Sequence, residues 1–113
     1  MIAQVRPSQL TEWLETVRGH GEPLVLDVRE PAELRVASVK TDGFELVSIP
    51  MGLIPPRLGE LDPGQPIACL CHHGVRSMQV AAFLKGRGFA HVANIAGGIN
   101  AWSAELDPSI PRY

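Results

Sequence analysis

The segment Cys71–Ser77, with the sequence CHHGVRS, contains the residue types of a cysteine-based reaction centre. Four residues separate Cys71 from Arg76, and the apolar run before Cys71 predicts a strand, whereas the residues after Arg76 predict a helix. The thiolate is the nucleophilic form of cysteine, and a helix N-terminus or a guanidinium group favours it. A short loop at that junction directs backbone N–H groups inward, and Gly74 allows it to close. The spacing therefore predicts a nucleophilic sulfur inside an anion-binding loop.

The other candidate groups of this loop have weaker signals. His72 and His73 can titrate near neutral pH, but two adjacent histidines without further ligands at metal spacing predict no metal site. We expect them to contribute mainly backbone N–H groups. Cys69 lies two residues before Cys71 in the predicted strand, so its side chain shares the same face at a deeper level. We expect Cys69 to pack in the core, with a redox role as the alternative.

A second pair of polar residues, Asp27 and Arg29, ends another predicted strand. A solvated turn is one explanation for this pair. However, ligands of open parallel α/β sheets bind beyond the carboxyl ends of the strands. We therefore expect Asp27 and Arg29 to shape the pocket that contains the sulfur.

Short strands and helices alternate along the chain and can bring these groups together. We predict strands at 24–28, 44–49, 67–71 and 91–95, and helices over 10–17, from Pro31, over the stripe 51–61, after Arg76 and after Gly98. Two prolines, Pro55 and Pro56, limit any regular helix in the stretch 51–61 to the residues after them. The alternation predicts a parallel sheet with helices on both faces. Residues 27–29, 71–76 and 96–98 then meet at one edge of the sheet.

The composition is that of one ordinary domain covering residues 1–113. Its 113 residues are 45% hydrophobic and 19% charged, and ten basic against twelve acidic side chains leave a net charge of −2. This balance predicts neither nucleic-acid binding nor a basic membrane-binding face. No signal peptide or membrane span is visible, and two cysteines do not form a disulfide framework. We expect a cytoplasmic protein with free thiols.

Three segments together resemble the signatures of the single-domain rhodanese-like sulfurtransferases: DVREPAE (27–33), CHHGVRS (71–77) and GGINAW (97–102). The resemblance implies an α/β three-layer sandwich with a five-stranded, mostly parallel sheet covered by helices on both faces. It also implies a catalytic cysteine, matched by Cys71, that cycles between thiolate and persulfide. The backbone amides of the loop residues would hold the persulfide, and Arg76 would assist substrate binding; these residues are His72, His73, Gly74, Val75, Arg76 and Ser77. One departure is Ala37-Ser38-Val39, where family members often have Gly-His-Ile.

The predicted function is transfer of a sulfane sulfur from a donor such as thiosulfate to a thiophilic acceptor such as cyanide or a thiol. A protein can also serve as donor or acceptor, and we expect no cofactor, metal, nucleic acid or membrane partner. One alternative is a non-catalytic rhodanese-like binding module. Another is a cysteine-dependent phosphatase or arsenate reductase, but those loops place five residues between cysteine and arginine, one more than here.

Overall fold

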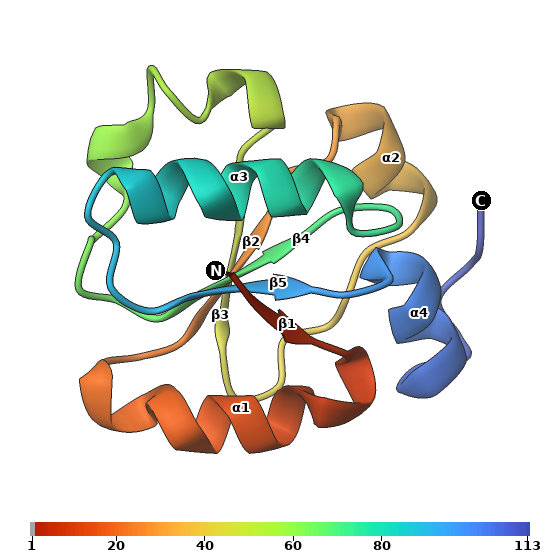
Figure 1. Ribbon diagram of the computed structural model, residues 1–113. Coiled ribbons are helices and arrows are strands. Elements are labelled where there is room, and N and C mark those ends of the chain that lie inside the picture. The colour runs from red at the N-terminus through yellow and green to blue at the C-terminus, as the bar shows by residue number, and fades with distance from the viewer. Residues whose placement is uncertain (1) are drawn as a thin grey trace.

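The computed structural model describes residues 2–113 and is built on a five-stranded sheet (Figure 1). The strands are β1 (Ala3–Val5), β2 (Leu24–Asp27), β3 (Glu45–Ser48), β4 (Ile67–Leu70) and β5 (Val92–Ile95). Their order is β1-β5-β4-β2-β3, and every neighbouring pair is parallel. The predicted α/β class is therefore confirmed, and the sheet is parallel throughout the described residues.

Helices cover both faces of this sheet (Figure 1). They are α1 (Leu10–Val17), α2 (Pro31–Val36), α3 (Val75–Gly86) and α4 (Gly98–Glu105), with short 3-10 turns η1 (Pro7–Gln9), η2 (Arg18–His20), η3 (Met51–Leu53) and η4 (Leu58–Glu60). The helix α3 packs on one face and α1 on the opposite face. No helix within residues 2–113 is both long enough and apolar enough to cross a membrane.

The central strands explain why the sheet needs two covering layers. Every residue of β2 and of β4 is buried, as expected for parallel strands with helices on both sides. Alternate residues enter different cores: Leu26 and Cys69 pack with Leu84 of α3, whereas Val25 packs with Leu14 of α1. The alternation fixes the register, because a shift by one residue would exchange the two faces.

Two segments differ from the sequence-based expectations. The residue pattern gave only four strands, and the fifth, β1, has three residues and pairs with β5 at the edge of the sheet. The segment 51–61 was predicted to be helical after its prolines but contains only the turns η3 and η4. Pro55 and Pro56 lack the backbone donors that an α-helix needs, and the five residues 57–61 after them are too few for a regular helix, so the apolar residues of this segment are buried without one.

Candidate active site

The three motif segments meet at the carboxyl edge of the sheet. Asp27 pairs in register with Leu70, the residue before Cys71, and β5 on the other side of β4 leads into Gly97 and Gly98. The backbone N–H of Ile99 donates to the Cys71 carbonyl at 2.8 Å. The parallel topology therefore places residues 27–29, 71–76 and 96–98 side by side, as the alternation of elements predicted.

The two glycines of the third segment are required by close approach to the cysteine loop. Gly97 and Gly98 both have positive φ, at 80° and 59°. A Cβ atom on Gly98 would overlap the carbonyl oxygens of Cys71 and His72. The start of α4 can therefore contact the outer side of the loop only because this position has no side chain.

The loop itself surrounds the sulfur of Cys71 and leads directly into α3. Gly74 adopts a φ of 102°, and its backbone N–H donates to the Cys71 Sγ at 3.0 Å. The helix α3 begins at the next residue, so the sulfur lies by the end of the helix where backbone N–H groups are free. Cys71 is only 1% exposed. A negatively charged group attached to the sulfur would meet these free N–H groups.

A buried polar chain begins at Ser77 in the first turn of α3. Its Oγ lies 3.2 Å from the Cys71 Sγ and donates to Asn94 Oδ1 at 2.5 Å. The amide nitrogen of Asn94 donates to Gln4 Oε1 at 3.0 Å and to the Gly74 carbonyl at 3.2 Å. Because the Asn94 nitrogen already donates twice, its oxygen accepts the Ser77 hydrogen. The Ser77 oxygen is then free to accept from a neutral Cys71 thiol.

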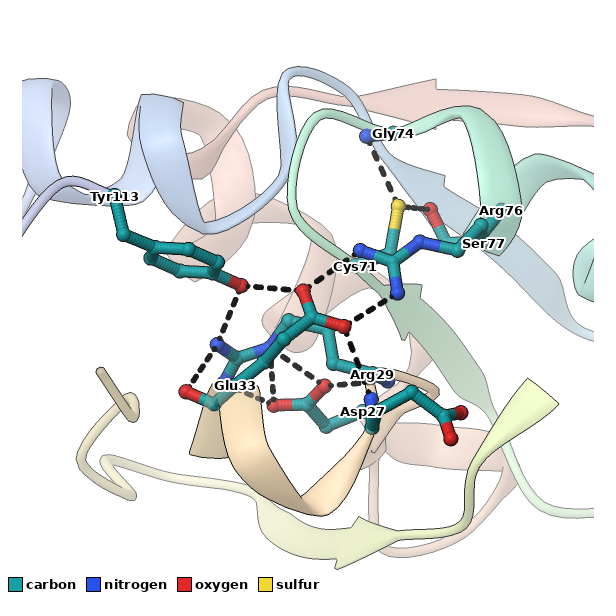
Figure 2. A network of polar contacts seen from close by, with 9 residues as sticks. Asp27, Arg29, Glu33, Cys71, Gly74, Arg76, Ser77 and Tyr113 are labelled. Atoms are coloured by element: carbon teal, nitrogen blue, oxygen red, sulfur yellow. Dashed lines mark hydrogen bonds and ion pairs between the residues drawn. The ribbon is translucent and has the colours of Figure 1, made fainter. Parts of the chain in front are cut away.

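Arg76 is oriented by an acidic residue of α2. Its Nη1 and Nη2 donate to Glu33 Oε1 and Oε2 at 2.6 Å and 2.8 Å (Figure 2). The Arg76 guanidinium lowers the pKa of Glu33 to about 2, and the carboxylate in turn raises the pKa of Arg76. The guanidinium also interacts electrostatically with Cys71. Arg76 is therefore a fixed positive group beside the loop, shared with a carboxylate.

Asp27 and Arg29 form a buried pair beneath Glu33. They are 1% and 0% exposed, and the Arg29 Nη2 donates to Asp27 Oδ2 at 2.7 Å. The remaining Arg29 nitrogen, Nη1, donates to the Tyr113 hydroxyl at 3.0 Å. No hydrogen bond joins Asp27 or Arg29 to Cys71, so this pair supports the site without a direct hydrogen bond to the sulfur. Both side chains are buried, which excludes a solvated turn.

The two histidines of the loop stack on each other with ring centroids 3.9 Å apart. Burial lowers the pKa of His72, and its buried Nε2 has no hydrogen-bond partner. Val75 is 69% exposed and presents an apolar side chain beside the loop. Within residues 2–113, no three His, Cys, Asp or Glu side chains are grouped so that they could hold a metal ion.

Cys69 has the environment of a packing residue. It is fully buried in the core beneath α3, on the same side of the sheet as Cys71. Burial raises its pKa to about 12, with a smaller contribution from Cys71. Both cysteines are free thiols. A thiol that is neutral and inaccessible is a poor nucleophile, which favours the core role over the redox role.

Three polar residues of the site were missed by the sequence analysis. Glu33 is the last residue of the DVREPAE segment, so this motif could have indicated it. Asn94 and Tyr113 lie outside the three motif segments. The Ala37-Ser38-Val39 departure has a local solution. The Ser38 hydroxyl donates to the Leu34 carbonyl at 2.7 Å, and Ala37 and Val39 are buried. The turn after α2 is thus formed without a histidine.

The fold and site define a class: an α/β domain that holds a thiol in the loop before a helix, at the carboxyl edge of a parallel sheet. The family model of the rhodanese-like domain matches residues 10–105. The chain belongs to the rhodanese-like domain family, as the three sequence segments predicted.

Individual relatives agree with this assignment. The chain is 35% identical over 103 residues to a sulfurtransferase of Allochromatium vinosum, covering 91% of this chain and 90% of that protein. It is 44% identical over 94 residues to the rhodanese-like/PpiC domain-containing protein 12 of Arabidopsis thaliana, covering 81% of this chain but only 31% of that longer protein. A rhodanese-related protein from Thermoplasma volcanium superposes with a TM-score of 0.77 at 27% identity, covering 98% and 99% of the two chains. Sulfur transfer is thus the activity named for the Allochromatium vinosum protein, of which the chain covers 90%.

Proposed function

We propose that this domain is a sulfurtransferase that carries a sulfane sulfur as a persulfide on Cys71. The observation that carries the proposal is the position of the Cys71 Sγ, which accepts the Gly74 N–H at the start of α3 and lies beside Arg76. The same groups that favour a thiolate also favour the negative charge of a persulfide. Membership of the rhodanese-like family and similarity to a protein named as a sulfurtransferase support this proposal.

The reaction consists of two displacements at sulfur. The Cys71 thiolate attacks the outer sulfur of thiosulfate, a new S–S bond forms, and sulfite leaves with the electron pair of the bond that breaks. Cyanide or a thiolate then attacks the outer sulfur of the persulfide, and Cys71 leaves as a thiolate. Each step conserves electrons, so no external oxidant or reductant is needed, and ping-pong kinetics are expected.

The residues around Cys71 have separate parts in these steps. The loop from His72 to Ser77 holds the negative charge, with the Gly74 N–H as its most direct donor. Arg76 attracts an anionic donor while Glu33 fixes its orientation. The buried ion pair of Asp27 and Arg29 supports this arrangement. Small sulfur compounds can serve as donor and as acceptor in this chemistry. A protein persulfide can replace the donor, and a protein thiol can replace the acceptor.

Intact mass spectrometry tests the persulfide directly. After incubation with thiosulfate, the mass of the protein should rise by one sulfur atom, and cyanide should remove that atom as thiocyanate. The Cys71→Ser variant should show neither event, whereas Cys69→Ala, a matched change of the other cysteine, should retain both. Full thiocyanate production by Cys71→Ser would refute the assignment.

A non-catalytic binding module is the second candidate, and one observation favours it. Cys71 is only 1% exposed, and the Arg76 charge is already paired with Glu33. The loop therefore leaves the sulfur little access to a substrate, as in a purely structural loop. The binding-module role predicts that the protein takes no sulfur from thiosulfate, from polysulfide or from a small-molecule persulfide. Hydrolysis of an aryl phosphate without sulfur transfer would instead indicate phosphatase chemistry.

A further inference from the structure

Tyr113 lies far from the three motif segments in the sequence, yet its hydroxyl contacts two polar groups of the site. It accepts from the Arg29 Nη1 at 3.0 Å and donates to the Glu33 Oε2 at 2.7 Å. Arginine can only donate, so the single hydroxyl hydrogen must point to Glu33. The directions of both hydrogen bonds are thus fixed. The Tyr113 hydroxyl bridges the fully buried Arg29 guanidinium and the Glu33 carboxylate near the loop (Figure 2).

The carboxylate that Tyr113 contacts is the one that orients Arg76. The Glu33 Oε2 receives both the Tyr113 hydroxyl and the Arg76 Nη2, while Oε1 receives the Arg76 Nη1 and the backbone N–H of Glu30. Four donors therefore restrict the rotation of one carboxylate. Tyr113 supplies the only one of these donors that comes from the segment after α4, and it connects Arg76 to the buried Asp27–Arg29 pair.

The ring of Tyr113 also contacts the cysteine loop itself. It stacks on His72 with centroids 3.9 Å apart and an interplanar angle of 9°. On the backbone side, the His72 carbonyl accepts the N–H of Asn100 at 3.2 Å. The residue next to Cys71 is therefore fixed by α4 through its backbone and by Tyr113 through its side chain.

Tyr113 is 39% exposed, and the contacts of its hydroxyl and the stacking of its ring on His72 add to the partial burial in fixing its position. The segment after α4 is anchored three residues earlier at Ile110, which is 4% exposed and whose carbonyl accepts the Ser103 hydroxyl at 2.7 Å. The anchor brings the segment to the edge of the site, and the specific polar contacts then determine where the phenol lies.

We propose that Tyr113 is a positioning residue of the Cys71 site: through Glu33 it fixes the Arg76 guanidinium, and through His72 it fixes the loop, so that an anionic donor is aligned with the sulfur. The inference rests on the proposed function and adds a residue to it. Tyr113 itself takes no part in bond making or breaking.

Two alkylating reagents of different charge test this role without requiring sulfur transfer. Iodoacetate carries a carboxylate that the Arg76 guanidinium can orient, whereas iodoacetamide is neutral, and both alkylate the Cys71 thiolate with loss of iodide. The ratio of the two rates therefore measures how well the site aligns an anion. The variants are Tyr113→Phe, which keeps the ring but removes the hydroxyl, and Tyr113→Leu, which removes both; Arg112→Ala is the control in the same segment.

We expect Tyr113→Phe to lower the iodoacetate to iodoacetamide rate ratio about fivefold, the size of one ordinary intramolecular hydrogen bond. Its iodoacetamide rate should remain within about twofold of the original. Tyr113→Leu should lower the ratio at least as much and should also slow both reagents, since His72 loses its stacking partner. Arg112→Ala should change neither rate. With thiosulfate as donor, KM should rise in Tyr113→Phe while kcat changes little.

An unchanged ratio in both Tyr113 variants would overturn the inference, and so would an equal slowing of both reagents in Tyr113→Phe, which indicates a general structural role. These outcomes are separate from failure of the proposed function. An unsubstituted protein that alkylates at Cys71 but accepts no sulfur would refute sulfur transfer, while the rate ratio would still decide the role of Tyr113.

Discussion

Arg76 and Glu33, which are 43 positions apart in the sequence, form a two-pronged ion pair with N–O distances of 2.6 Å and 2.8 Å. Two parallel hydrogen bonds fix both the direction and the plane of the guanidinium. The positive group beside Cys71 therefore depends on a carboxylate from another helix, and the pair has measurable consequences for stability.

The pH dependence of stability should report on Glu33. Its folded-state pKa of about 2 lies below the ordinary value of 4.5, because Arg76 stabilises the carboxylate. This contribution is complete above about pH 4.5 and is lost as the pH falls towards 2. We expect the free energy of unfolding of Glu33→Gln at pH 7 to be about 1–2 kcal/mol lower than that of the unsubstituted protein, after allowance for solvent screening. Urea denaturation at several pH values measures this difference. It should shrink towards pH 2, and a constant difference would contradict the prediction.

The hydroxyl of Ser77 should affect the reactivity of Cys71. Its hydrogen points to Asn94 when Cys71 is a thiol, and it can turn to the sulfur 3.2 Å away when the thiolate forms. We expect Ser77→Ala to slow alkylation of Cys71 by iodoacetamide at pH 7 about three- to tenfold, because the thiolate loses a donor. Ser103→Ala is the matched control, since Ser103 is also buried but bonds to Ile110. Equal rates for the two variants would exclude this role of Ser77.

Gly98 should tolerate no side chain. Its φ of 59° and its contact with the carbonyl oxygens of Cys71 and His72 leave no room for a Cβ atom. We expect Gly98→Ala to lower the free energy of unfolding by about 2–4 kcal/mol. Gly86 in α3 has nothing within 4 Å of an added Cβ, so Gly86→Ala should be neutral or stabilising by up to about 1 kcal/mol. Urea denaturation of both variants compares the two positions, and similar effects would contradict the close approach.

The two cysteines should react differently in the folded protein. Burial raises the pKa of Cys69 to about 12, whereas the Cys71 Sγ accepts the Gly74 N–H at the start of α3, so iodoacetamide at pH 8 should add one label to the native protein, at Cys71. The unfolded protein should take two labels under the same conditions. Peptide mass spectrometry locates each label, and modification of Cys69 without unfolding would show that the core beneath α3 opens readily.

The sequence predicted most of the regular elements because their signals are local. The apolar runs at 24–28 and 67–71 became the fully buried strands β2 and β4 within one residue at their ends. The three-residue strand β1 was missed because so short a segment has no measurable period, and it is a strand only through pairing with β5. In the segment 51–61, the apolar spacing indicated a helix, but Pro55 and Pro56 exclude one before residue 57, and the short stretch that remains, 57–61, forms only the turn η4.

The sequence by itself determined the chemistry available at the candidate site. The order of strand, Cys71, glycine-containing loop, Arg76 and helix depends on neighbouring residues, so the loop and its sulfur could be recognised without coordinates. Only the tertiary structure decided which groups surround that sulfur. Glu33 meets Arg76, Asn94 meets Ser77, and Tyr113 meets Glu33 across separations of 43, 17 and 80 positions. These contacts exist because parallel strands bring distant segments to one edge of the sheet, and no local pattern encodes which side chains meet there.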